Sequence, residues 1–239
     1  MWYNRKVDFA VPLEDVLKKL IDLIKKNPQV YWFFGFLFVG SFYFLTQYLP
    51  VERHVIHLAI DDSIPFLPIF ILPYYLWYIY VPLPMIFLCF KDRAAFRRGC
   101  ITLFGGMFLS CIFFLIYPTS IDFRANAEGE GILLWLTRFI YSHDAPANVL
   151  PSLHCLEATA AHLAVFVGCP FYRRKIGWHI ASLVGLILIC LSTIFVKQHS
   201  VIDLVTGVLV PVVIFLAVML AERLIRKKKE AKAANGEAN

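Results

Sequence analysis

Six long apolar segments, separated by shorter polar and charged stretches, set the pattern of this 239-residue chain. An α-helix needs roughly 20 apolar residues to cross the hydrocarbon core of a bilayer, and each segment is close to that length. The predicted spans are residues 30–49, 66–90, 99–118, 152–169, 176–196 and 201–222, of which the fourth is at the short limit. The pattern therefore predicts an all-α fold, an integral membrane bundle of six transmembrane helices.

Basic residues cluster before the first span, after the last, and in every second connection. The clusters lie within residues 5–26, 91–98, 173–175 and 223–229, whereas the connections 50–65, 119–151 and 197–200 are poor in Lys and Arg. Lys and Arg are enriched on the cytoplasmic side of membrane proteins. Because six crossings put all four clusters on one side, both the N- and the C-terminus are predicted to be cytoplasmic.

Two shorter segments predict helices that lie on the membrane surface. In residues 13–24, apolar side chains recur at helical spacing opposite Lys18, Lys19 and Asp22, which is typical of a helix resting on the inner leaflet. Residues 132–141 are apolar and predict a short helix on the outer surface. The expected organisation is an amphipathic interfacial segment at 1–29, a membrane domain at 30–222 and a basic, largely disordered cytoplasmic tail at 223–239.

The composition favours a bilayer as the main solvent. Hydrophobic residues make up 59% of the chain and charged residues 17%, against about 25% charged residues in soluble domains. The net charge of +6 lies in the short clusters described above, so nucleic acid is not expected as a partner. The six cysteines lie in or beside apolar runs, as small buried hydrophobic residues do. No cleavable signal peptide is visible, so the first span is expected to direct membrane insertion.

Two motifs at the ends of predicted spans carry the candidate chemistry. His199 and Asp203 are four positions apart at the start of the sixth span, a spacing that puts both on one helix face. A carboxylate there can hold the imidazole through Nδ1–H and leave Nε2 free as a nucleophile. A helix-end pair that only satisfies itself has the same spacing, so this motif alone does not decide. Gly207, one turn further on, allows another helix close to that face.

The second motif is Pro151-Ser152-Leu153-His154 at the start of the fourth span. Ser152 is a candidate N-cap, and the free N–H groups of a helix start attract anions. His154 would then protonate a leaving oxygen of a bound phosphate. Six crossings bring both motifs, and Arg124 after the third span, to the outer face. This convergence favours chemistry on a phosphate carried by a lipid.

The two motifs resemble the second and third signatures of the type 2 phosphatidic acid phosphatase superfamily, which consists of six-helix membrane lipid phosphatases and related headgroup transferases. Residues 144–148 (DAPAN) and 64–68 (IPFLP) are similar to its subgroup related to inositol phosphorylceramide synthases. The resemblance implies that His199 attacks phosphorus, Asp203 orients it and His154 protonates the leaving alkoxide. It implies a phosphohistidine intermediate, no metal and no cofactor.

The first signature of that family, Lys-x6-Arg-Pro, has no full match in the chain. Residues 91–98 have the Lys-to-Arg spacing, but they belong to a cytoplasmic cluster and Gly99 follows in place of proline. Arg124 on the outer side is the better candidate. Tyr117 stands at its lysine position, and Ala125 stands at its proline position.

The third signature also lacks a cation, because Thr193 stands where the family usually has arginine. Each lost cation removes charge-assisted hydrogen bonds worth roughly 1.5–3 kcal/mol. A site with fewer cations suits a singly charged phosphodiester better than a monoester, which tilts the prediction toward headgroup transfer. The candidate substrate-binding residues are Arg124, Ser152, Asn148, Ser192 and Thr193.

Several other polar residues have plainer interpretations. Glu157, one turn after His154, is expected to hydrogen-bond within the pocket or to restrain an acceptor. Lys197 and Arg138 are expected to be interfacial anchors, and Asp61 and Asp62 to be solvated acids of a loop. His162 is expected to form a hydrogen bond across the bundle.

The predicted function is metal-independent phosphoryl transfer, in the first place by a lipid phosphatase acting on phosphatidic acid or on a polyprenyl phosphate or pyrophosphate. One alternative is a phospholipid headgroup transferase of the sphingolipid or inositol-phosphate synthase type, with an alcohol acceptor. A further alternative is a lipid-binding or transport protein without turnover. The expected partners are the lipid and the bilayer, and a homo-oligomer is left open. The expected location is a bacterial plasma membrane with the site facing outward, or an endomembrane with a luminal site.

Overall fold

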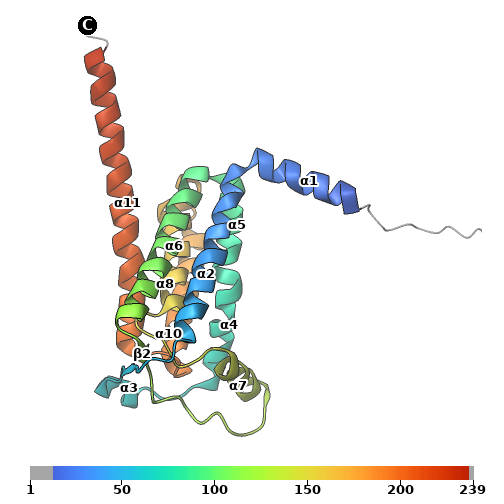
Figure 1. Ribbon diagram of the computed structural model, residues 1–239, viewed down its shortest axis with the longest axis vertical. Helices are drawn as coiled ribbons and strands as arrows, with labels where there is room; N and C mark the ends of the chain where they lie inside the picture. Colours follow the sequence, from blue (N-terminus) through green and yellow to red (C-terminus); the bar gives the residue numbers. More distant parts are fainter. Residues whose placement is uncertain (1–12, 237–239) are drawn as a thin grey trace, which may run out of the picture.

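The computed structural model describes residues 13–236, which fold into helices apart from one small pair of strands (Figure 1). The longer helices are α1 (Leu13–Lys26), α2 (Phe33–Gln47), α6 (Arg93–Ile116), α10 (Ile176–Phe195) and α11 (Val201–Gly236). The shorter ones are η1 (Pro28–Trp32), α3 (Ala59–Ser63), η2 (Pro68–Phe70), α4 (Ile71–Tyr80), α5 (Pro82–Lys91), α7 (Ile132–His143), α8 (Leu153–His162), η3 (Leu163–Val167) and α9 (Pro170–Arg173). The strands β1 (His54–Val55) and β2 (Thr119–Ser120) pair in parallel.

Five helical stretches of the described chain are long and apolar enough to cross a membrane. They are Pro28–Gln47, Pro68–Lys91, Arg93–Ile116, Ile176–Phe195 and Val201–Ala233. The prediction of an all-α fold with membrane-spanning helices is therefore confirmed. The count of six spans and the side on which each terminus lies stay predictions.

The residues expected as the fourth span form a shorter rod at the centre of the bundle. Its two parts, α8 and the π-helical turn η3, have 10 and 5 residues. Together they are about 22 Å long at 1.5 Å per residue. Almost every residue of α8 is buried, and the helix packs against α6, α10 and α11. Because protein and not lipid surrounds α8, it can carry polar side chains into the interior.

Helix boundaries follow from local chemistry. Asp92 caps α6, because its Oδ1 accepts hydrogen bonds from the backbone N–H groups of Ala94 and Ala95 at 3.1 and 2.9 Å. Pro82 stands in the first turn of α5, where a missing N–H costs nothing. Ser152 caps α8 as the sequence predicts, with its Oγ accepting from Cys155 N at 3.4 Å.

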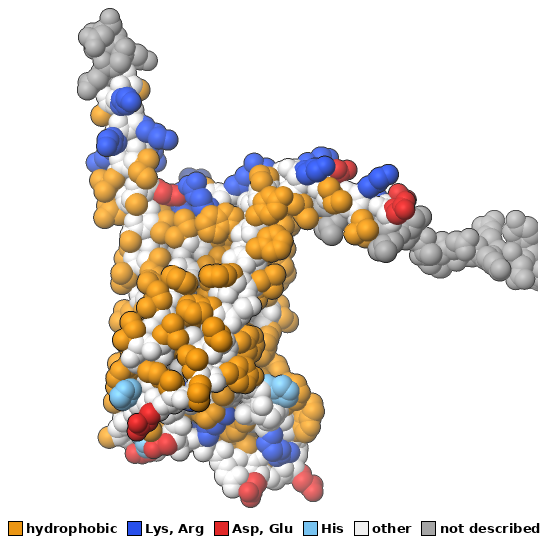
Figure 2. Space-filling model, in the orientation of Figure 1, with side chains coloured by type: hydrophobic (Ala, Val, Ile, Leu, Met, Phe, Trp, Pro, Cys, Tyr) orange, Lys and Arg blue, Asp and Glu red, His pale blue; other side chains and the backbone are white. Residues whose placement is uncertain are grey.

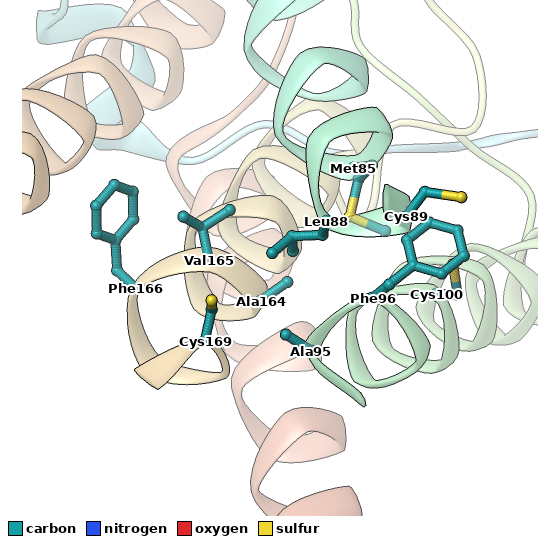
Figure 3. Packing of buried hydrophobic residues seen from close by; sticks show 10 residues of the cluster. All are labelled: Met85, Leu88, Cys89, Ala95, Phe96, Cys100, Ala164, Val165, Phe166 and Cys169. Atoms are coloured by element: carbon teal, nitrogen blue, oxygen red, sulfur yellow. The ribbon is translucent and has the colours of Figure 1, made fainter. Parts of the chain in front are cut away.

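The bundle is held by apolar packing between α5, α6 and the end of the central rod. Figure 3 shows Leu88 of α5 close to Ala164 of η3, and the ring of Phe96 of α6 beside Cys89 of α5. The other members of this cluster are Met85, Cys89, Ala95, Cys100, Val165, Phe166 and Cys169. The cysteines of the chain are free and buried, as expected for small hydrophobic residues.

The two ends of the bundle differ in charge. Figure 2 shows Lys and Arg side chains gathered on α1 and on the projecting part of α11, beyond a wide hydrophobic surface. The opposite end holds α3, α7, the strands and the start of α11 (Figure 1). The Nδ1 atom of His162 in α8 is 2.9 Å from Ser182 Oγ of α10, so the predicted bond across the bundle is confirmed.

Helices form in both segments that predict surface helices, and one expectation about the tail is wrong. The helices α1 and α7 form where amphipathic and apolar patterns predict them. The tail was expected to be disordered, but α11 continues through residues 223–236. Ala, Lys, Arg and Glu favour helices, and extending an existing helix avoids the cost of nucleation. Residues 1–12 of the predicted interfacial segment, with Arg5 and Lys6, lie outside the described residues.

Candidate active site

The starts of α8 and α11 are docked directly against each other. The backbone N–H of Ser152 donates to the carbonyl of Asp203 at 3.0 Å. A Cβ atom at Gly207 would lie only 2.5 Å from the Ser152 carbonyl oxygen, so glycine is required for this approach. The close contact that Gly207 predicts is therefore confirmed, and it fixes His154 relative to the first turn of α11.

His199 lies in the short connection before α11 and is held by Asp203. The Nδ1 atom of His199 is 3.4 Å from Asp203 Oδ2, and the same oxygen accepts from Ser200 N at 2.9 Å. Both side chains are buried. Burial lowers the pKa of His199, but the hydrogen bond and charge of Asp203 outweigh it, so the pKa lies above its ordinary value. This arrangement leaves Nε2 as the free nitrogen of the ring.

His154 faces His199 from the first turn of α8. The two ring centroids are 5.8 Å apart with the planes at 64°. The rings of Tyr74 and Trp77 each lie 4.7 Å from the His154 ring and fix its position. The structure thus brings together the three residues His154, His199 and Asp203 that the sequence predicts to be catalytic.

Both histidines line one cavity of about 420 Å³, which opens between α2, α4, α7 and α8. Its apolar wall includes Phe36, Phe44, Met107 and Phe139. The other polar side chains that line it are Tyr43, Gln47, Trp77, Tyr78, His143, Asp144, Asn148, Glu157 and Gln198. A cavity with an apolar wall and a few convergent polar groups is typical of a ligand site.

Asp144 belongs to this cavity, although sequence reasoning gave it no role. Its Oδ2 accepts hydrogen bonds from Tyr74 OH at 2.9 Å and from Gln198 Nε2 at 3.2 Å. These contacts join α4, the end of α7 and the connection that carries His199. The only signal in the sequence was its place in the DAPAN run, which gave no indication of its partners.

Asp61 is a second residue that sequence reasoning misjudged. It was expected to be a solvated loop acid, but it is 2% exposed. Its Oδ2 accepts from Ser200 Oγ at 2.6 Å and its Oδ1 accepts from Val201 N at 3.0 Å. Asp61 therefore caps α11 from the short helix α3, which is distant in the chain. Lys197, expected as an interfacial anchor, instead donates to the Asp61 carbonyl at 2.7 Å.

Arg124 does not converge with the histidines as predicted, because it does not line the cavity. Its guanidinium donates to the carbonyls of Tyr141 and Asp144 and lies 4.7 Å from the centre of the Tyr141 ring. Burial lowers the pKa of Arg124, and the Asp144 carboxylate opposes that shift. The contacts make Arg124 a support for the Asp144 connection. Arg138 likewise supports a connection, because its guanidinium donates to the carbonyl of Ala127 at 2.7 Å.

Of the four other residues predicted to bind substrate, one lines the cavity and three do not. Asn148 lines the cavity, with its Nδ2 donating to Thr46 Oγ1 at 3.1 Å. Ser152, Ser192 and Thr193 do not line it. Ser192 Oγ and Thr193 Oγ1 donate to backbone carbonyls in their own helix at 2.6 and 2.7 Å, because a hydroxyl inside an apolar helix must find a nearby acceptor.

Glu157 is buried and faces the cavity one turn from His154. Among residues 13–236, no three His, Cys, Asp or Glu side chains are arranged to hold a metal ion.

Neither the models of known protein families nor the curated proteins include a match to this chain. We therefore argue the function from the geometry of the site.

Proposed function

We propose that this protein is a membrane phosphotransferase of the type 2 phosphatidic acid phosphatase superfamily, which acts on a lipid-linked phosphate through a phosphohistidine at His199. The observation that carries the proposal is the pairing of His154 and His199 across one cavity, with Asp203 behind His199. One imidazole can then attack while the other transfers a proton.

In the first half of the reaction, Nε2 of His199 attacks phosphorus. The new P–N bond forms as the bond between phosphorus and the leaving oxygen breaks, and protonated His154 gives its proton to that oxygen. Asp203 stabilises the positive charge that develops on the His199 ring. The start of α8 adds the positive end of a helix dipole next to the phosphate.

In the second half, the oxygen of water or of an alcohol attacks the phosphohistidine. The P–N bond breaks, His199 is regenerated, and the attacking oxygen passes its proton to His154. Phosphatase and transferase therefore differ only in the acceptor.

The charge of the cavity supports a phosphodiester substrate over a monoester. Among the described residues, no Lys or Arg side chain lines the cavity, whereas Asp144 and Glu157 do. A monoester carries up to two negative charges and a diester carries one, so carboxylates disfavour the monoester more strongly. This observation favours headgroup transfer over hydrolysis of phosphatidic acid or a polyprenyl phosphate.

The charge at the two ends of the molecule supports an outward-facing site. The Lys and Arg clusters on α1 and α11 lie at the end opposite α3 and α7, and the cytoplasmic side attracts such clusters. We place the site on the outer face of a bacterial plasma membrane, which corresponds to the lumen if the protein lies in an endomembrane.

The test is lipid turnover by the full-length chain in lipid nanodiscs with a chelator present. The candidate substrates are phosphatidic acid, a prenyl pyrophosphate and phospholipid diesters, the last with and without an added alcohol. We expect His199→Ala to lose at least about 10³-fold in turnover, because it lacks the nucleophile. Rapid mixing should trap an acid-labile phosphoryl group on the wild-type protein alone.

The matched control is His54→Ala. His54 lies at the same end of the bundle but stacks on Tyr117 outside the cavity, so its loss should change turnover by less than a few fold. Turnover by His199→Ala close to that of the wild type would refute the proposal.

A further inference from the structure

The side chains around the histidines offer an excess of hydrogen-bond acceptors. Asn148 Oδ1 and Gln198 Oε1 are buried and have no hydrogen-bond partner. The amide nitrogens fix the orientation of both side chains, because Gln198 Nε2 donates to the Asp144 carboxylate and Asn148 Nδ2 donates to Thr46. Thr46 can only accept there, since its own hydroxyl donates to a carbonyl. Both residues line the cavity, and neither of these buried oxygens has a donor within the described residues.

Two carboxyl groups that line the cavity add to this excess of acceptors. Glu157 is 4% exposed, lines the cavity and makes no side-chain hydrogen bond within the described residues. The Oδ2 atom of Asp144 accepts two hydrogen bonds, whereas its Oδ1 accepts none from the described residues. A buried carboxylate needs a donor or a cation to offset the loss of water. The remaining titratable groups that can carry positive charge there are the imidazoles of His143, His154 and His199.

Aromatic rings complete the surroundings. Tyr43, Trp77 and Tyr78 line the same cavity, and the faces of such rings attract cations. Trp77 Nε1 is a buried donor without a partner, so it can serve a phosphate oxygen. The cavity thus combines acceptors and ring faces with few donors, the reverse of a site made for a phosphate dianion.

We propose that this cavity binds the headgroup of a phosphodiester lipid that carries a primary ammonium group, with Glu157 as a specificity-determining residue. The inference rests on the proposed function, since it puts the headgroup beside the phosphorus that His199 attacks. A primary ammonium group has three N–H donors, which match the free oxygens of Asn148 and Gln198 and the carboxylate of Glu157. A trimethylammonium group keeps the charge but has no N–H to donate.

The decisive experiment compares headgroups in two measurements on the full-length protein. Turnover is measured in nanodiscs that contain phosphatidylethanolamine, phosphatidylcholine, phosphatidylglycerol or phosphatidic acid. Binding is measured separately, by the shift in thermal unfolding with the water-soluble glycerophosphoethanolamine and glycerophosphoglycerol. We expect kcat/KM to be at least tenfold higher for phosphatidylethanolamine than for the other three lipids, and only the ethanolamine ligand to stabilise the protein.

The variant Glu157→Gln removes one charge and keeps the shape. It should raise KM for phosphatidylethanolamine about tenfold and reduce the preference for phosphatidylethanolamine over phosphatidylglycerol, measured as the ratio of the two kcat/KM values, by at least the same factor. The matched control is Glu128→Gln, an exposed acid on an outer connection, which should behave as wild type. A thermal melt of each variant establishes that it is folded.

The outcomes separate this inference from the proposed function. Equal or better turnover of phosphatidic acid or phosphatidylglycerol overturns the headgroup inference while phosphoryl transfer stands. So does a Glu157→Gln variant with an unchanged preference. If no lipid is turned over, the proposed function fails and binding decides: selective stabilisation by glycerophosphoethanolamine supports the headgroup site, and its absence rejects it.

Discussion

The His199 ring is held by one neighbour, Asp203, whose carboxylate is completely buried. Asp203 is 0% exposed and contacts both the His199 ring and the backbone N–H of Ser200. The backbone contact prevents the carboxylate from rotating away from the ring. At the scale of single residues, Asp203 therefore sets both the orientation and the proton affinity of His199.

Replacing this carboxylate should change the pH dependence of the reaction. In the proposed mechanism His199 attacks only when Nε2 is neutral, so activity should rise as pH passes through the raised pKa of His199. In Asp203→Asn the two largest effects that raise this pKa, the hydrogen bond and the charge of Asp203, are lost, while the lowering by burial remains. We expect the acidic limb of the kcat profile to move to lower pH, with the maximal rate reduced on the order of 10²- to 10⁴-fold. A limb that stays in place or moves to higher pH would contradict this role.

At the scale of elements, the start of α11 is capped by a residue of α3, a helix far away in the chain. Asp61 accepts from Ser200 Oγ and from Val201 N, so α3 fixes the helix that carries Asp203. In the proposed reaction Asp61 would act through the position of α11, without contacting the substrate.

The variant Asp61→Asn should separate positioning from binding. The amide can accept at only one of the two atoms, so α11 loses part of its cap at a cost of about 1–2 kcal/mol. We expect kcat to fall by up to about 10²-fold, since small misplacements of reacting groups are costly, with KM nearly unchanged. Steady-state kinetics and thermal unfolding are the measurements. The exposed neighbour Glu52, changed to Gln, is the control, and an equal loss in both variants would argue against a specific cap.

The contact between α8 and α11 gives a test of packing. In Gly207→Ala the new methyl group meets the Ser152 carbonyl at 2.5 Å and Cys155 Cβ at 2.9 Å. We expect a loss of about 1–3 kcal/mol together with lower activity, because His154 moves with α8. Gly105→Ala, whose new methyl group meets nothing within 4 Å, should be neutral or stabilising by up to about 1 kcal/mol. A Gly207→Ala protein as stable and active as wild type would rule out this close contact.

At the scale of the whole molecule, the helices divide charge between two ends and place the candidate site at one of them. Helix α11 has 36 residues, about 54 Å at 1.5 Å per residue, so it extends well past a hydrocarbon core of about 30 Å. Its projecting part carries Lys and Arg side chains (Figure 2). The molecule therefore has a basic end, an apolar middle and an end with the two histidines.

Cysteine labelling tests the orientation that follows from this division. All six native cysteines are buried, so they give a low background with a membrane-impermeant maleimide. Glu130 and Lys229 are exposed near opposite ends. In intact cells, Glu130→Cys should be labelled and Lys229→Cys should be labelled only after lysis. The reverse result would put the candidate site on the cytoplasmic side.

Patterns that span a few helical turns could be predicted from the sequence because they depend on local spacing. The apolar segments, the helices α1 and α7, the Ser152 cap and the contact between His199 and Asp203 are of this kind. The helical tail was misjudged, because a polar composition suggested disorder where an existing helix could continue.

Tertiary structure decided every contact between distant parts of the chain. Asp61 and Ser200 are 139 positions apart, and Tyr74 and Asp144 are 70 apart, so no local pattern connects them. Arg124 was predicted to bind phosphate because its residue type and side of the membrane fitted, but the fold offered it backbone carbonyls. Buried polar groups must find partners, and which partners are within reach depends on how the whole bundle packs. The sequence by itself determined the class of fold and the paired histidines, and only the folded bundle decided which polar groups surround them.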